Sequence, residues 1–158
     1  MSTACYPIGP PPGVSAVRWQ LHFDTRSSAQ GVGDPELYRG AHEMAEWGDH
    51  HGMHQVLFSE HHGAADGYLP SPMVMAGALS AATEHCTVAL KALVLTLKDP
   101  AAAAEDAAVV DQLSNGRLEI RVVPGYAQAD FAMYGVDPKV SDLCLRVEAR
   151  GYCCRACG

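Results

Sequence analysis

Three adjacent ionisable residues, Glu60, His61 and His62, directly follow a short apolar run in the sequence. Histidine is the side chain whose charge changes most readily near neutral pH. A histidine held beside a carboxylate at the end of a strand can act as a general acid or base. The pattern makes His61 and Glu60 candidate catalytic residues. A histidine in such a place is also commonly a hydrogen-bonding anchor for a loop.

A second group of histidines, His50, His51 and His54, precedes the same apolar run. Combined with residues 60–62, they raise the hypothesis of a metal-dependent hydrolase. These histidines are expected at the end of a helix, and in a barrel built from strands and helices they would lie on the face opposite His61. A solvated helix C-terminus also accounts for them. No metal is therefore expected.

The elements that must position these residues follow from the apolar patterning. Apolar and polar residues alternate from Val17 to Asp24, which is typical of a strand. The apolar runs at 55–59, 87–96 and 117–123 are three further predicted strands. Asp34-Pro35, Ser71-Pro72 and Asp99-Pro100 each place a capping residue before a proline, so each predicts the start of a helix. The third helix is expected to end at Asn115-Gly116.

Strands that alternate with helices favour an α/β fold with a parallel sheet. An open doubly wound sheet and a (β/α)8 barrel both fit. The loop after the first strand, residues 25–33, contains no GxGxxG or P-loop pattern, which disfavours a nucleotide-binding open sheet. We predict a TIM-type barrel. A complete barrel needs roughly 250 residues, so 158 residues supply about half of one, with four strands.

Active sites of such barrels lie at the C-terminal ends of the strands. The first strand ends near His22, the second at Glu60 and His61, and the fourth at residues 123–126. The candidate cofactor-binding residues at these ends are His22, Val123, Pro124, Gly125 and Tyr126. Gly125 would let the backbone approach a ligand closely.

Three stretches resemble the bacterial-luciferase-like superfamily of flavin-dependent monooxygenases. They are VLFSEHHGAADGYLPSPMVMAGALSAAT (56–83), VALKALVLTLKDPAAAAEDAAVVDQLSNGRLEIRVVPGY (88–126) and AQADFAMYGVDPK (127–139). The resemblance extends from about Val17 to Lys139. It is specific in the order and spacing of Glu-His-His, Asp-Pro and Asp-Gln-Leu-Ser-Asn-Gly-Arg.

The resemblance implies that His61 is catalytic and faces the flavin, with Glu60 and His62 as its neighbours. It also implies a non-prolyl cis peptide against the flavin ring, near Lys91, Ala92 or Leu93. Val123 and Pro124 stand where luciferase has a cysteine and an arginine, so light emission is not implied. The expected cofactor is reduced FMN or coenzyme F420. The expected reaction acts on paired donors, a small-molecule substrate among them, and incorporates molecular oxygen.

We expect three regions along the chain. Residues 1–16 are an irregular Pro-rich extension, and 17–139 are the N-terminal half of the barrel. Residues 140–158 are a divergent tail with four of the six cysteines, which a truncation or frameshift would explain. The alternative function is an inactive half-barrel that forms a homo-oligomer through its open strand edges.

The composition excludes several classes of protein. Hydrophobic residues make up 48% and charged residues 18%, which is typical of a globular domain. The net charge is −7, and no basic face indicates a nucleic-acid partner. No apolar run approaches the ~20 residues of a membrane helix. The N-terminus lacks the pattern of a secretion signal, so a cytoplasmic location is expected.

Overall fold

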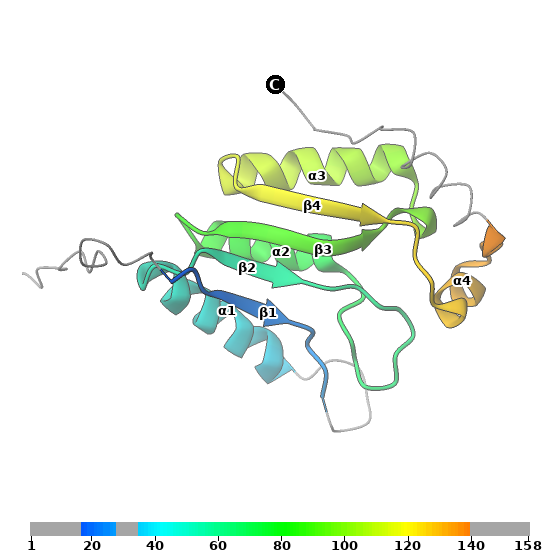
Figure 1. The fold of residues 1–158 in the computed structure, drawn as a ribbon, viewed down its shortest axis with the longest axis horizontal. Coiled ribbons are helices and arrows are strands. Elements are labelled where there is room, and N and C mark those ends of the chain that lie inside the picture. Colours follow the sequence, from blue (N-terminus) through cyan, green and yellow to red (C-terminus); the bar gives the residue numbers. More distant parts are fainter. Residues whose placement is uncertain (1–16, 28–34, 140–158) are drawn as a thin grey trace, which may run out of the picture.

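The computed structural model describes residues 17–27 and 35–139, and within these ranges the chain is an α/β structure. Four strands form one parallel sheet in the order β1-β2-β3-β4, and helices connect them (Figure 1). The strands are β1 (Gln20–Phe23), β2 (Gln55–Phe58), β3 (Thr87–Val94) and β4 (Leu118–Val123). The connecting helices are α1 (Pro35–His50), α2 (Pro72–Ala82) and α3 (Pro100–Ser114).

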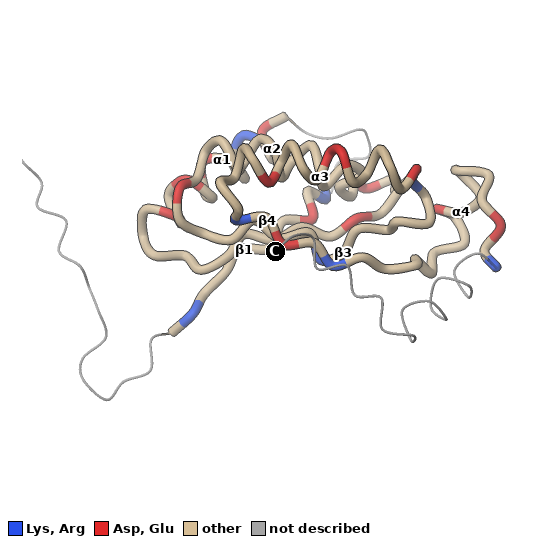
Figure 2. The backbone as a smooth tube through the Cα atoms, turned by 90° about the horizontal axis from the view of Figure 1, so that it is seen from above, with Lys and Arg blue, Asp and Glu red and all other residues tan. Residues whose placement is uncertain are grey.

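All three connecting helices cover the same face of the sheet (Figure 2). A doubly wound sheet would carry helices on both faces and would reverse its strand order. Neither feature occurs among the described elements. The sequential order and the single helical layer are those of a (β/α)8 barrel opened after four units, which confirms the predicted fold.

Alternation along the strands separates an apolar face from a polar one. Val56, Phe58, Val88 and Leu90 are fully buried and form the core with the helices. The other face carries polar side chains, including a buried Gln55 and the ion pair between Lys91 and Glu119. In a closed barrel this polar face points to the interior.

Several boundaries differ from those expected. The predicted strand at 87–96 ends at Val94, and a short 3-10 helix, η1 (Leu95–Leu97), follows it. The first strand begins at Gln20 and not at Val17, and the fourth begins at Leu118 and not at Arg117, because pairing with the neighbouring strand starts at these residues. A fourth helix, α4 (Gln128–Tyr134), was not predicted from the sequence. It lies beyond the C-terminal end of β4 (Figure 1).

The helices begin at the predicted prolines, but the predicted capping hydrogen bonds form only in part. The Asp99 carboxylate accepts hydrogen bonds from the N–H groups of Ala101 and Ala102, as an N-cap does. Ser71 is the N-cap residue of α2, as predicted, but its side chain makes no capping hydrogen bond. Asn115 ends α3 in the left-handed conformation, as predicted. Asp34 lies outside the described residues.

The described residues bear on the membrane expectation and show the surroundings of one cysteine. Within 17–27 and 35–139 no helix is both long and apolar enough to cross a membrane. Cys86 is buried, and burial, together with Asp49, raises the pKa of its thiol to about 11. Its thiol therefore stays protonated at neutral pH. The Pro-rich extension and the Cys-rich tail lie outside the described residues.

Candidate functional site

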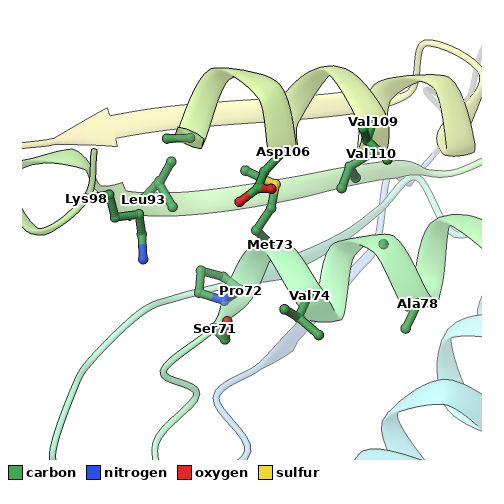
Figure 3. Close-up of a pocket in the computed structure, with 12 residues that line it drawn as sticks. Ser71, Pro72, Met73, Val74, Ala78, Leu93, Lys98, Asp106, Val109 and Val110 are labelled. Atoms are coloured by element: carbon green, nitrogen blue, oxygen red, sulfur yellow. The ribbon is translucent and has the colours of Figure 1, made fainter. Parts of the chain in front are cut away.

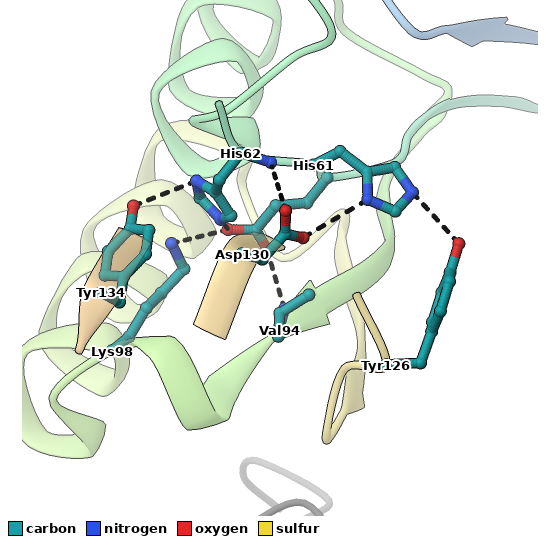
Figure 4. Close-up of polar contacts among 8 residues, drawn as sticks. His61, His62, Val94, Lys98, Tyr126, Asp130 and Tyr134 are labelled. Carbon is teal, nitrogen blue, oxygen red and sulfur yellow. Dashed lines mark hydrogen bonds and ion pairs between the residues drawn. The ribbon is translucent and has the colours of Figure 1, made fainter. Parts of the chain in front are cut away.

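The candidate catalytic residues lie where the chain leaves β2, beside η1 and α4 (Figure 4). These three segments follow the C-terminal ends of β2, β3 and β4. They come together because the C-terminal ends of the parallel strands all lie at the same end of the sheet. Figure 4 shows that His62 is turned toward Tyr134 and Lys98, whereas His61 is turned toward Tyr126.

Glu60 is at the centre of this cluster, with a side chain that is fully buried. Its Oε1 receives His62 Nε2 at 2.8 Å and Lys98 Nζ at 2.7 Å, and its Oε2 accepts the Val94 N–H at 2.8 Å. Burial alone would raise the pKa of this carboxyl. The hydrogen bonds and the Lys98 charge outweigh burial and lower the pKa of Glu60. Glu60 is therefore an ionised carboxylate at neutral pH.

His61 is held between two polar groups and remains partly open to solvent. Its Nδ1 lies 3.4 Å from Asp130 Oδ2, and its Nε2 lies 3.3 Å from the Tyr126 hydroxyl. A carboxylate can only accept, so Nδ1 carries a proton, and in the neutral imidazole Nε2 is the acceptor. The side chain of His61 is 30% exposed, whereas that of Asp130 is 8% exposed. Nε2 thus meets the hydroxyl of Tyr126, a residue on the exposed side of the site.

Aromatic rings surround the His61 imidazole. Tyr68 and Tyr126 approach it edge to face, with ring centroids at 4.8 Å and 5.8 Å. Tyr126 is 80% exposed, so its ring is available to a ligand. Such edges and faces offer stacking surfaces to a planar heterocycle.

His22, near the end of β1, is linked by two hydrogen bonds to the ends of β2 and β3. Its Nε2 lies 2.8 Å from Ser59 Oγ, and the Ser59 hydroxyl donates to the Lys91 carbonyl at 3.0 Å. The peptide bond between Lys91 and Ala92 is cis, within the range that the resemblance implied. The Lys91 ammonium points elsewhere, to Gln55 Oε1 at 3.0 Å and to Glu119 Oε1 at 3.3 Å.

The other predicted cofactor-binding residues lie in different surroundings: one in the core, one against a small apolar cluster and one in a hydrogen bond. Leu93 is 2% exposed and packs in the helix-side core, so its side chain is turned away from His61. Val123 packs against the small apolar cluster of Val94, Leu97 and Phe131. The Pro124 carbonyl accepts a hydrogen bond from the Thr96 hydroxyl at 2.7 Å.

Gly125 is required by its own surroundings. Its φ is +78°, and a Cβ there would lie 2.7 Å from Val94 Cγ1 and 3.3 Å from Phe131 Cζ. Both the conformation and the space exclude a side chain. The neighbouring Val94 and Phe131 side chains therefore explain this glycine without any ligand.

Reasoning from the sequence missed three residues of the site: Lys98, Asp130 and Tyr134. Asp130 and Tyr134 are four residues apart on α4 and face His61 and His62. The spacing i, i+4 was the available signal, because it places both side chains on one face of a helix. Nothing in the sequence indicated which residues that face would meet.

A cavity of about 350 Å³ lies on the helix side of the sheet, between α2 and α3 (Figure 3). Its lining is mainly apolar, with Asp106 and Lys98 as its charged residues. Lys98 is the single residue that both lines this cavity and contacts Glu60. His61 does not line it, so the cavity is not the place where His61 would meet a ligand.

The described part of the chain contains no group of three or more His, Cys, Asp or Glu residues that could hold a metal ion. His50 and His51 lie at the end of α1, and His54 lies before β2. His61 follows the opposite end of β2. The metal-dependent hydrolase hypothesis therefore gains no support from these residues.

Comparison with known proteins relates most of the chain to luciferase-like monooxygenases. Residues 20–142 match the family model described as luciferase-like monooxygenase. The alkanal monooxygenase alpha chain of Photorhabdus laumondii is 35% identical over 86 residues, which are 54% of this chain and 24% of that protein.

Two solved structures share the fold. One is the oxygenating constituent of 3,6-diketocamphane monooxygenase from Pseudomonas putida, in complex with FMN, with a TM-score of 0.69 and 22% identity. The match covers 76% of this chain and 33% of that one. The other is the coenzyme F420 dependent tetrahydromethanopterin reductase from Methanopyrus kandleri, with a TM-score of 0.56 and 18% identity. Here 78% of this chain and 32% of that chain are covered.

The chain thus spans no more than 33% of the length of these three proteins. The family match itself covers well over half of the chain, from the first described strand to beyond α4. The chain belongs to the luciferase-like monooxygenase family.

Proposed function

We propose that this chain provides the flavin-facing part of a flavin-dependent monooxygenase, with His61 as the group that accepts or donates a proton. The observation that carries the proposal is the environment of His61. Asp130 accepts from Nδ1, and Nε2 meets the hydroxyl of the exposed Tyr126 at the C-terminal ends of the strands. This is the arrangement of a general base that a second carboxylate orients.

The residues present fit the ring end of a flavin. Tyr126 and His61 offer partly exposed rings at the strand ends, where ligands of (β/α)8 barrels bind. The cations near this edge already have carboxylate partners: Lys98 pairs with Glu60, and Arg26 pairs with Asp24. The phosphate end would therefore need groups beyond those that surround His61.

Within this proposal each residue has a distinct role. The bound flavin would supply the redox chemistry between the donors and molecular oxygen. His61 would hold or move a proton at Nε2, and Asp130 would fix the orientation of its ring. Tyr126 would move its hydroxyl away from Nε2 when a ligand takes its place. His22, Val123, Pro124 and the backbone of Lys91 and Ala92 would contact the cofactor at the neighbouring strand ends.

The cofactor is FMN or coenzyme F420. The Pseudomonas putida relative is a complex with FMN, and the Methanopyrus kandleri relative depends on coenzyme F420. We propose a small-molecule substrate as the second of the paired donors, because the part of the site that is exposed around His61, at the C-terminal ends of the strands, is limited to the His61 imidazole and the Tyr126 ring.

Titration of the purified chain with each cofactor tests this proposal. We expect saturable quenching of flavin fluorescence with FMN or with coenzyme F420, and weaker binding after His61→Ala. His50→Ala, at the far end of the sheet, serves as the matched control and should bind as the original chain does. Absence of saturable binding to either cofactor contradicts the proposal for this chain.

A second candidate function is a half-barrel without catalytic activity that assembles with another copy. The observation that favours it is the presence of two open strand edges, β1 and β4, in the described sheet. Unpaired edges present N–H and C=O groups that a further strand can satisfy. Light scattering coupled to size-exclusion chromatography decides this. A dimer supports assembly, and a monomer at all concentrations rules it out.

A further inference from the structure

Three aromatic side chains lie together at the N-terminal end of the sheet, opposite the end that carries His61. They are Trp19, just before β1, Trp47, near the end of α1, and His51, just after that helix. The His51 ring stacks on the Trp47 ring, with centroids 4.0 Å apart and planes at 17°, and the Trp19 ring lies 6.3 Å from that of Trp47. Trp47 is 58% exposed, His51 is exposed and Trp19 is half-buried. These three residues form an aromatic patch on the surface.

The patch is held by the backbone around it. The His51 Nδ1 atom lies 2.7 Å from the Trp47 carbonyl oxygen. The tip of the Trp19 ring lies against α1, because a Cβ added to Gly48 would be 3.3 Å from Trp19 Cη2. The Trp19 carbonyl accepts the backbone N–H of His54 at 2.9 Å. The rings therefore hold their positions before any ligand arrives.

A surface made of indole rings favours one kind of partner. Proline-rich segments dock in aromatic-lined grooves when they bind to proteins. Such a segment already favours the extended polyproline II conformation, so it loses little conformational entropy on binding. The patch thus has the chemistry of a site for a proline-rich segment.

The chain carries such a segment directly before the patch, outside the described residues. Residues 1–16 contain no Asp, Glu, Lys, Arg or His, so covering the rings with them desolvates no charged side chain. Their prolines are Pro7, Pro10, Pro11 and Pro12.

The link between these prolines and the patch is short. Residues 13–16 separate the last proline from Val17, and a link of four residues spans up to about 14 Å. Trp19 follows Val17 by two positions. The link is therefore long enough for the prolines to turn back onto the Trp19 and Trp47 rings.

We propose that the aromatic patch binds the proline-rich segment 7–12 of the same chain, with proline rings packed on Trp47 and Trp19. The bound segment covers the N-terminal end of the sheet next to β1, which is an edge strand among the described strands. In (β/α)8 barrels this end serves stability, whereas the opposite end serves catalysis. The segment therefore stabilises the first strand without touching His61.

Tryptophan fluorescence of the full chain reports on this patch alone, because both tryptophans of the chain belong to it. The test compares the original chain with a variant that combines Pro7→Ala, Pro10→Ala, Pro11→Ala and Pro12→Ala. We expect acrylamide to quench the variant more strongly, and its emission maximum to lie at a longer wavelength, because the indole rings lose their cover. The matched control combines Ser2→Ala with Thr3→Ala in the same extension and should behave as the original chain does.

A synthetic peptide of residues 7–13, added to the proline variant, tests the patch itself. We expect saturable protection from acrylamide with a dissociation constant of about a millimolar or lower, since a short link supplies an attached segment at millimolar effective concentration. Adding Trp47→Ala to the proline variant should abolish this protection, as measured through Trp19. Circular dichroism checks that each variant is folded.

Three results overturn the proposal. The first is equal quenching of the original chain and the proline variant, and the second is a peptide that gives no saturable protection. The third is protection in the original chain that disappears on dilution, because the segment would then come from a second copy of the chain. Protection that persists on dilution supports binding within one chain.

Discussion

The carboxylate of Asp49, at the end of α1, receives the backbone N–H groups of three successive residues, Glu84, His85 and Cys86. These groups lie between α2 and β3, and Asp49 is 4% exposed. Burial alone would raise the pKa of Asp49. The hydrogen bonds from Glu84, Cys86 and His85 outweigh burial and lower it below 3.8. Asp49 thus fixes the entry to β3 while it is ionised.

We expect Asp49→Asn to destabilise the chain by about 2 kcal/mol at pH 7, because hydrogen bonds to a charged group are lost. The folded pKa lies below the unfolded value of 3.8, so the carboxylate stabilises the fold above pH 3.8. This contribution is lost as the pH falls through the folded pKa. Urea unfolding as a function of pH measures both effects.

The variant should show a weaker acid dependence than the original chain. Glu43→Gln, at an exposed position on the same helix, is the matched control and should leave both quantities nearly unchanged. Equal acid dependence in the original chain and in Asp49→Asn would contradict this role.

Single residues of the site could be predicted only in part. Glu60, His61 and His22 were predicted because they lie at the ends of strands, and the C-terminal ends of parallel strands lie together. Asp130 contacts His61 across 69 positions of sequence. No local pattern encodes that distance, so this partner required the structure.

At the scale of elements, two helices with the same sequence signal begin in different ways. The Asp99 side chain caps α3 with two hydrogen bonds, whereas Ser71 makes none at the start of α2. Proline occupies the first position of both helices, where its fixed φ already suits a helix. Capping is therefore a separate contribution from the proline in α3 and is missing in α2.

We expect Asp99→Ala to lower the free energy of unfolding by about 1 kcal/mol, the usual cost of a lost N-cap. Ser71→Ala is the matched control, with an expected change within about 0.5 kcal/mol. Thermal and urea unfolding of the two variants give the comparison. A loss for Ser71→Ala equal to that for Asp99→Ala would show that the assignment of caps is wrong.

The elements that the sequence predicted are those with strong local signals. Proline pairs and apolar runs located three helices and four strands to within a few residues. The α4 helix has seven residues and an alanine at its N-cap position, with no capping hydrogen bond. A helix so short is not stable alone, and contacts with the Glu60–His62 segment hold it. Its formation depends on tertiary structure.

At the scale of the whole molecule, the strands differ in how many neighbours they have. β2 and β3 pair on both sides, whereas β1 and β4 pair on one side only among the described strands. The free-energy cost of breaking the backbone hydrogen bonds of a strand therefore differs across the sheet. It is low for the edge strands and approaches the free energy of global unfolding for the central strands.

Hydrogen exchange followed by mass spectrometry should show this difference. We expect peptides from β2 and β3 to exchange most slowly and those from β1 and β4 to exchange faster. The control is to repeat the exchange at lower protein concentration. Protection of an edge strand by a second copy of the chain decreases on dilution, whereas protection within one chain does not. Slow exchange at both edges that persists on dilution would contradict the open sheet.

The sequential order β1-β2-β3-β4 also has a consequence for synthesis. Each strand pairs with the strand made immediately before it, so the next unit always meets a neighbour that has already left the ribosome. No pairing formed early must open to admit a later strand. The sheet can therefore grow in the direction of translation, with pairing added at one edge while the β1 edge stays as it formed.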